Sequence, residues 1–186
     1  MAHPCRPGPP WVQPNSKSNN KPNFTARAPG TLWVQRVVGI DLTKVPGLRS
    51  SLVLTISSEL GTDMSQWPTV KHFAAWFGLA PRNDISGGRV LRSRVLKNVN
   101  RATQAFRQAA QAVARSDSAV GAYFRRLRAK MGPEQATVAT AHKIARVVYH
   151  LLKYHEPFEP TTAGEYDQQC RARELTYLAR KAAKLG

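Results

Sequence analysis

The sequence predicts a mostly α-helical domain that contains a helix-hairpin-helix, a short extended or β-ribbon insertion near residues 82–98, and a long C-terminal helix. Three observations carry this prediction. Apolar residues recur at helical spacing through most of the chain, a Pro-Gly turn separates two such segments, and Gly87-Gly88 opens a run in which polar and apolar residues alternate. Hydrophobic residues make up 42% of the sequence, which is enough to build a core.

The chain divides into three parts by composition. Residues 1–30 hold seven of the 13 prolines, with Asn, Ser and Lys between them, so we expect a disordered proline-rich leader. Residues 31–160 should form the main, DNA-binding domain, and residues 161–186 a C-terminal helical tail.

The helical periodicity can be followed segment by segment. Residues 37–61 should contain a short helix, a turn at Pro46-Gly47 and a longer helix that ends at Gly61. A further helix is expected after Pro68, with Val70, Phe73, Ala74 and Phe77 on its buried side. Four more helices are predicted at about 100–115, 118–130, 133–154 and 165–185. The second of these should be capped by Asp117 or Ser116, and the last carries a weak apolar stripe.

The charge of the chain indicates the class of its partner. The 28 Lys and Arg residues against 11 Asp and Glu give a net charge of +17, which requires an anionic partner, usually a nucleic acid. A ribosomal, nucleoid or transposition role fits this charge equally well. The two cysteines, Cys5 and Cys170, form no disulfide framework or zinc motif, and no apolar run approaches the roughly 20 residues that span a bilayer. We therefore expect a cytoplasmic, nucleoid-associated protein without a membrane partner.

The turn around Pro46-Gly47 is the first candidate contact with DNA. In a helix-hairpin-helix the backbone N–H groups of the turn and of the next helix meet a phosphate without reading sequence. Arg49 follows the turn and would add charge to that contact. The alternative is an ordinary connection between two helices, because Pro-Gly is a common turn dipeptide.

A basic run is the second candidate. Residues 89–130 contain eleven Lys and Arg residues against the single acid Asp117. The N-terminal half of the run lacks acids to pair with and should bind phosphates without sequence preference. The residues concerned are Arg89, Arg92, Arg94, Lys97 and Arg101. For Arg125, Arg126 and Arg128 a solvated helix surface is at least as good an interpretation.

The third candidate is the segment Ser86-Gly87-Gly88. Two glycines after a serine let the backbone approach a ligand closely and leave the hydroxyl accessible for attack on a phosphodiester, with Arg82, Arg89 and Arg92 to stabilise the charge that develops. By spacing alone a flexible turn explains the same residues. The acids are scattered and the five histidines show no ligand spacing, so no metal site is expected in this chain.

Longer stretches resemble one protein family. SSELGTDMSQWPTVKHFAAWFGLAP (57–81), NDISGGRVLRSR (83–94) and TAHKIARVVYHLLKYHEPF (140–158) are similar to the C-terminal domain of the "one-ten" group of insertion-sequence transposases. The tail EYDQQCRARELTYLARKAAKLG is similar to the end of such proteins, and the resemblance runs from about residue 19 to residue 186.

The resemblance implies a DNA recombinase. Members join a RuvC-like domain, whose four acidic residues bind Mg²⁺, to a C-terminal domain with a serine nucleophile, and Ser86 is the matching position here. They act as oligomers on DNA, with a structured "bridge" RNA as guide in characterised members. No RuvC-like half is recognised in this chain. We therefore expect incomplete catalysis by the chain alone, with a second copy or a full-length transposase acting in trans. The alternatives are a non-catalytic remnant that binds nucleic acid, or a reading frame without a stable product.

Overall fold

The computed structural model describes residues 35–36, 39–61, 63–95 and 100–184, except for the side chains of Ser93 and Arg94. The leader predicted for residues 1–30 lies outside the described residues. In chain order the elements are η1 (Leu42–Lys44), α2 (Ser50–Leu60), α3 (Val70–Trp76), β1 (Pro81–Ser86), β2 (Arg89–Val95), α4 (Arg101–Ala112), η2 (Val113–Arg115), α5 (Ala119–Met131), α6 (Pro133–Tyr154) and α7 (Ala163–Ala182). The mostly helical class, the short ribbon and the long C-terminal helix are confirmed.

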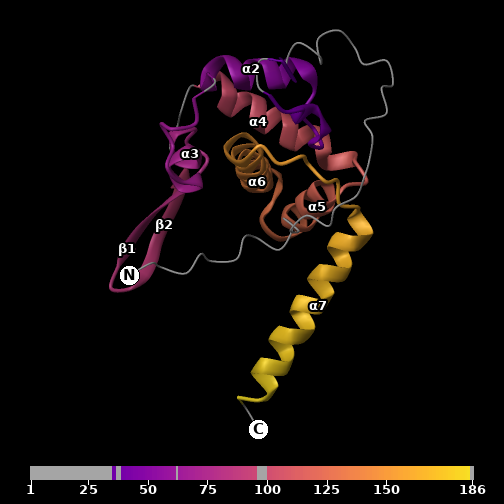
Figure 1. Ribbon diagram of the computed structural model, residues 1–186. Coiled ribbons are helices and arrows are strands. Elements are labelled where there is room, and N and C mark those ends of the chain that lie inside the picture. Colours follow the sequence, from indigo (N-terminus) through magenta and orange to yellow (C-terminus); the bar gives the residue numbers. More distant parts are fainter. Residues whose placement is uncertain (1–34, 37–38, 62, 96–99, 185–186) are drawn as a thin grey trace, which may run out of the picture.

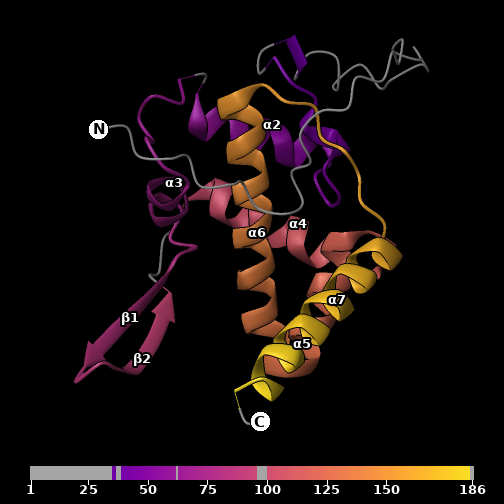
Figure 2. The ribbon, with the colours of Figure 1, turned by 60° about the horizontal axis from the view of Figure 1, so that its bottom comes forward.

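Helix α6 lies in the middle of the molecule. Figures 1 and 2 show α3 and the β1–β2 hairpin on one side of it and α5 and α7 on the other. It contacts α3, α4 and α5, and ten of its residues are buried. The apolar residues at helical spacing along it are mostly buried: Ala141, Ala145, Val148, Leu151 and Leu152 are buried and Val138 is half-buried. A helix with neighbours on several sides needs this wide apolar surface.

Five aromatic rings join α3 to the rest of the core. This aromatic cluster consists of Trp67, Phe73, Phe77, Phe106 and Tyr149, with ring centroids 4.9 to 5.5 Å apart in the contacting pairs. The edge-to-face geometry of most of these pairs is favourable for aromatic rings. Two hydroxyl groups secure the same region: Tyr149 donates to the carbonyl of Trp67 at 3.1 Å, and Thr103 donates to that of Phe77 at 2.7 Å.

The turn at Pro46-Gly47 is packed against α4. Leu48 N donates to the Val45 carbonyl at 3.1 Å, and Gly47 has φ +87°, the geometry of a turn with proline second and glycine third. A Cβ at Gly47 would lie 2.4 Å from the Ala109 carbonyl oxygen. The short helix predicted before the turn is a single 3₁₀ turn, η1, because Asp41 caps it and Pro46 follows closely.

Two predicted helix starts are corrected. The N-cap of α5 is Ser118, whose Oγ accepts from Gly121 N at 3.1 Å; Ser116 instead bonds to the Val113 carbonyl and to Ser118. Helix α7 begins at Ala163, two residues earlier than predicted. Thr162 and Glu165 form a capping box there, in which each side chain bonds to the other residue's backbone N–H.

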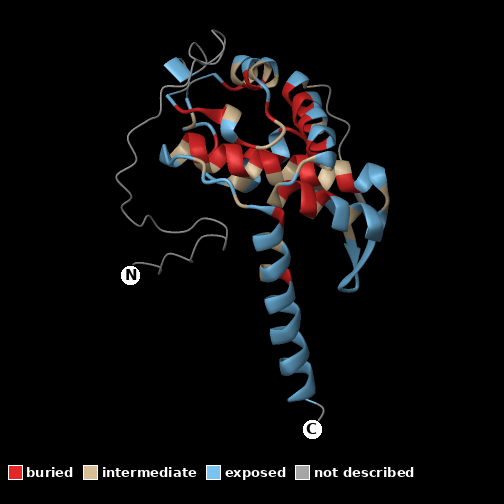
Figure 3. Cartoon of the chain, turned by 90° about the vertical axis from the view of Figure 1, so that its right-hand side faces the viewer, coloured by how far each residue is buried: buried red, intermediate tan, exposed pale blue. Residues whose placement is uncertain are grey.

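Helix α7 projects from the helical body (Figure 3). Its first half packs on α5: Ala163 and Cys170 are buried, and Glu174 pairs with Arg126. The weak stripe predicted for its second half is exposed, as Leu175 and Leu178 show. Among the described helices none has the length and apolar character needed to cross a membrane.

The close contact at Gly47 gives a prediction. Gly47→Ala places a methyl group against α4 and should destabilise the fold by about 1–3 kcal/mol more than Gly61→Ala does. Gly61 is the matched control, since it also has positive φ (+67°) but open space where a Cβ would lie. Chemical denaturation of both variants measures the difference in free energy of unfolding. Equal losses would mean that α4 moves away from the turn at no cost.

Candidate nucleic-acid interface

The Ser86 segment forms the tip of a β-hairpin. β1 and β2 are antiparallel, and Ser86 pairs with Arg89 across the two-residue turn Gly87-Gly88. Both glycines have positive φ, +56° and +73°, as the tight hairpin turn that matches strand twist requires. Of the two structures proposed for residues 82–98, the β-ribbon is therefore the observed one for residues 81–95.

A bulge in β2 places the functional residues on one face. Asp84 pairs with Arg92 while Ile85 pairs with Val90, so Leu91 has no partner across the ladder. In a regular strand Arg89 and Arg92, three residues apart, would lie on opposite faces. The extra residue restores Arg89 to the face of Arg92.

This face, called the basic face below, carries Arg82, Ser86, Arg89 and Arg92, with Asp84 among them. The three arginines and Ser86 are exposed, and Asp84 is half-buried. Arg94 pairs with Arg82 along the backbone, and its side chain is outside the described residues. Three exposed guanidinium groups beside one hydroxyl form a surface suited to phosphate.

The hairpin also exposes apolar side chains. Ile85 and Val90, which pair on the opposite face, are 64% and 54% exposed, and Leu91 at the bulge is 72% exposed. No described residue of the hairpin belongs to the hydrophobic core. Figure 1 shows it extending away from the helical body beyond α3.

The remaining predicted contacts are dispersed. Arg49 is exposed at the N-terminus of α2, directly after the Pro46-Gly47 turn, and Arg101 is exposed at the first residue of α4. Lys97 lies outside the described residues. The structure therefore groups Arg82, Ser86, Arg89 and Arg92, while it gives Arg49 and Arg101 separate positions at helix starts.

Sequence reasoning missed a second basic site, a cavity between α5, α6 and α7. Lys143, Arg146 and Arg173 line it together with Tyr123 and Tyr166. Its signals were weak: two cations three residues apart on α6, and Tyr166 and Arg173 seven residues apart on α7. His142 is half-buried at this cavity; burial, with Arg146 nearby, lowers its pKa.

The described side chains form no cluster of metal ligands. Within the described ranges, no three His, Cys, Asp or Glu side chains group as a metal site would require. The family resemblance assigns Mg²⁺ to the RuvC-like domain rather than to this chain, and that assignment stays a prediction.

Comparison with known proteins identifies part of the chain. Residues 41–125 match the model of the family described as Transposase IS116/IS110/IS902. The matched segment runs from the cap of η1 through the hairpin and α4 into α5. No curated protein matches the sequence.

The turn geometry gives a prediction for the hairpin. Gly87→Asn should preserve it, because asparagine tolerates positive φ, whereas Gly87→Val should unpair the strands. Steric clash with neighbouring residues does not contribute, since a Cβ at Gly87 meets nothing within 4 Å. Amide hydrogen exchange of β1 and β2 measures the pairing, with the thermal midpoint as control for the helical body. Equal protection in both variants would contradict the turn assignment.

Proposed function

We propose, from the match of residues 41–125 to the Transposase IS116/IS110/IS902 family model, that the chain acts in transposition and that its hairpin is the part that contacts DNA during strand exchange. The observation that carries the proposal is the placement of Ser86 on one face with Arg82, Arg89 and Arg92. A two-stranded ribbon can lie along or within the major groove of DNA. The hairpin projects from the body and is free of core contacts, as such an approach requires.

The basic face fits the DNA backbone rather than base edges. Arginine forks pair with phosphate oxygens, and such contacts position a protein without reading sequence. Neutralised phosphates release counterions, so the affinity should fall steeply with salt. Arg94, Lys97 and Arg101 extend the same basic run along the chain and are proposed as further contacts.

Arg49 and the start of α2 are a second proposed contact. Helix N-termini present unpaired N–H groups that favour a phosphate, and Arg49 is exposed beside them. The close packing of the turn against α4 is enough to explain why position 47 is a glycine. The helix-hairpin-helix interpretation, with Pro46 and Gly47 at the phosphate, thus stays a prediction.

Ser86 is proposed as the nucleophile. Its Oγ would form a bond to phosphorus while the bond from phosphorus to a deoxyribose oxygen breaks. The hydroxyl proton is lost, the leaving oxygen gains a proton, and no redox change occurs. The arginines of the basic face would stabilise the charge that accumulates on the phosphoryl oxygens. One phosphoester bond replaces another, so the bond energy is retained in the serine–DNA ester. A DNA hydroxyl can then attack that ester, release Ser86 and rejoin the strands.

The acidic residues for Mg²⁺ would come from a partner in trans, because the described residues offer no such group. A guide RNA and an oligomeric assembly are further expectations from the family resemblance. The second candidate function is binding without catalysis. It is favoured by the open surroundings of the hairpin tip, where Ser86 is exposed and a Cβ on either glycine meets nothing within 4 Å.

The basic face is tested by removing its charge. Replacing Arg82, Arg89 and Arg92 by Ala should weaken duplex DNA binding and reduce the slope of log K against log salt by about 2–3, since each phosphate contact contributes roughly 0.9. Fluorescence anisotropy at several salt concentrations measures both. The matched control replaces Arg171, Arg180 and Lys181 of α7, which removes the same charge elsewhere. An equal effect of both triple variants would rule out the hairpin as the principal contact.

The nucleophile is tested with Ser86→Ala. In a strand-transfer assay complemented by a separately expressed RuvC-like half, this variant should lose the covalent protein–DNA adduct while it keeps DNA affinity. Asn83→Ala, on the opposite face of the same hairpin, is the control and should retain the adduct. Strand transfer by Ser86→Ala at the wild-type rate would eliminate the serine step and leave the binding-only function.

A further inference from the structure

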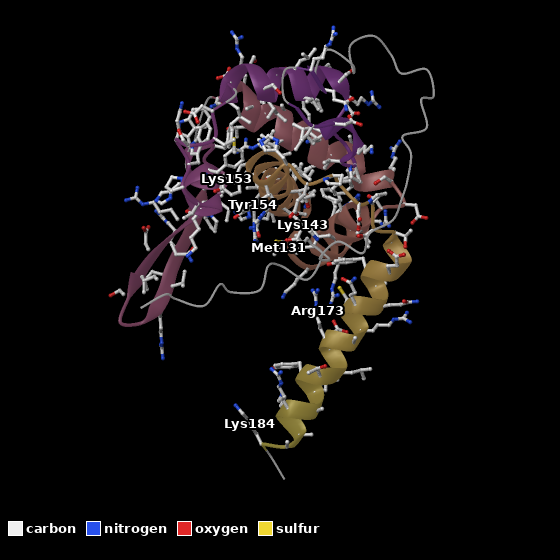
Figure 4. All side chains as sticks on the ribbon, viewed as in Figure 1. Met131, Lys143, Lys153, Tyr154, Arg173 and Lys184 are labelled. Carbon is white, nitrogen blue, oxygen red and sulfur yellow. The ribbon has the colours of Figure 1, made fainter. Side chains whose placement is uncertain are left out.

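A cavity of about 260 Å³ lies between α5, α6, α7 and the segment that joins α6 to α7. Lys143 and Arg146 come from α6, Tyr123 from α5, and Tyr166 and Arg173 from α7. Figure 4 labels Lys143 and Arg173, which reach this cavity from two different helices. Helices α5 and α7, which contribute to its lining, lie across α6 from the hairpin (Figures 1 and 2), and most of the lining residues are outside residues 41–125.

The charges around the cavity indicate an anionic ligand. Lys143, Arg146 and Arg173 line it against a single carboxylate, Glu159. The Nε of Arg146 is buried and has no hydrogen-bond partner among the described residues. A buried donor without an acceptor is costly, so an acceptor from outside the chain would satisfy it.

Lys143 is held in a fixed position. Its Nζ lies 4.0 Å from the ring centroid of Tyr123 and 4.9 Å from that of Tyr166, and the two rings are perpendicular. The pKa of Lys143 is lowered to about 8, chiefly by burial. Cys170 opposes this shift, and the charges of Arg173 and Arg146 add to it. The ring faces attract the ammonium through its charge, but they are weaker hydrogen-bond acceptors than an oxyanion. The N–H groups of Lys143 therefore remain available to an anionic ligand.

The size and the walls of the cavity exclude a bare ion as the whole ligand. A single water needs only about 10–15 Å³ of such space, far less than is present. Val120, Val147 and Phe158 provide apolar wall beside the charged groups. Apolar and aromatic walls next to convergent cations suit a planar ring joined to a phosphate.

We propose that this cavity binds one nucleotide, with its phosphate at Lys143, Arg146 and Arg173 and its base against the apolar wall. A base stacked within duplex DNA cannot enter a cavity between helices, so the nucleotide is either free or an unstacked residue of a single strand. The two sources share this chemistry. The proposal goes beyond the function of the hairpin and involves none of its residues.

The experiment measures binding to the full chain by isothermal titration with three probes: adenosine 5′-monophosphate, a short single-stranded oligothymidylate and inorganic phosphate. Saturable binding of either nucleotide probe, tighter than that of phosphate, is expected. Tighter binding of the monophosphate identifies a free nucleotide as the source, and tighter binding of the oligomer identifies a single strand. Absence of saturable binding by both, or equal affinity for phosphate, would overturn the proposal.

Variants locate the site. Arg173→Gln and Lys143→Gln should each weaken nucleotide binding by about tenfold or more, since each removes a charged hydrogen bond. Arg171→Gln, on the same helix but away from the cavity, should change it less than about twofold. Arg173 is exposed, so its replacement leaves the core intact, and a thermal melt checks each variant. Equal affinities for all three variants would refute the assignment.

Two further readouts separate this site from the hairpin. Alanine at Arg82, Arg89 and Arg92 should leave monophosphate binding unchanged even if it abolishes duplex binding.

The affinity for the monophosphate should also fall as pH rises above about 8, because a bound phosphate favours the charged form of Lys143. The groups facing Lys143 are Tyr123 from α5, Arg146 from α6, and Tyr166, Cys170 and Arg173 from α7. We expect the nucleotide affinity of the wild type to fall with rising pH and that of Lys143→Gln to be independent of pH. If the affinity of both proteins falls, Lys143 is not the cause.

Discussion

The contact of α3 with the core determines where the hairpin can act. Phe73 and Phe77 of α3 pack against Phe106 of α4 and Tyr149 of α6, and the Thr103 hydroxyl bonds to the Phe77 carbonyl in buried surroundings. Buried aromatic rings contribute large apolar areas, and a buried hydrogen bond is costly to break. Since β1 begins only four residues after Phe77, this anchoring fixes the base of the hairpin on one side of α6.

Beyond that anchor no described residue of the hairpin belongs to the hydrophobic core, which leaves its sequence available for surface chemistry. Its exposed residues include three arginines and three large apolar side chains, a composition that core packing would not tolerate. The bulge at Leu91 is the local feature that keeps Arg89 on the face of Arg92. Bulges are common where a strand must redirect a side chain, and here the redirected side chain is next to Ser86.

The sequence alone predicted what depends on local periodicity. Helices α3 to α6 follow from apolar spacing, and Gly61, Pro68 and Pro133 mark helix boundaries through their own backbone preferences. Features that depend on contacts between distant segments were not accessible. The register of Arg89 and Arg92 can be assigned only when the cross-strand pairing is known. Glycine is required at position 47 because a Cβ there would meet the Ala109 carbonyl oxygen, far along the chain. The cavity at Lys143 needs three helices to meet, and no short motif records that meeting.

Charge distribution links the two surfaces. Evenly distributed, a net charge of +17 would mainly produce repulsion within the chain. Here exposed cations lie on the hairpin, and two half-buried cations of α6, Lys143 and Arg146, line the cavity. Exposed arginines meet a duplex backbone at low desolvation cost, while cations in a cavity must be matched by an anion that enters it. If both proposals hold, the two environments select different forms of nucleic acid: a paired backbone at the hairpin and an unstacked nucleotide in the cavity. Helix α6 lies between the hairpin on one side and α5 and α7 on the other, and it contacts both α3 and α5.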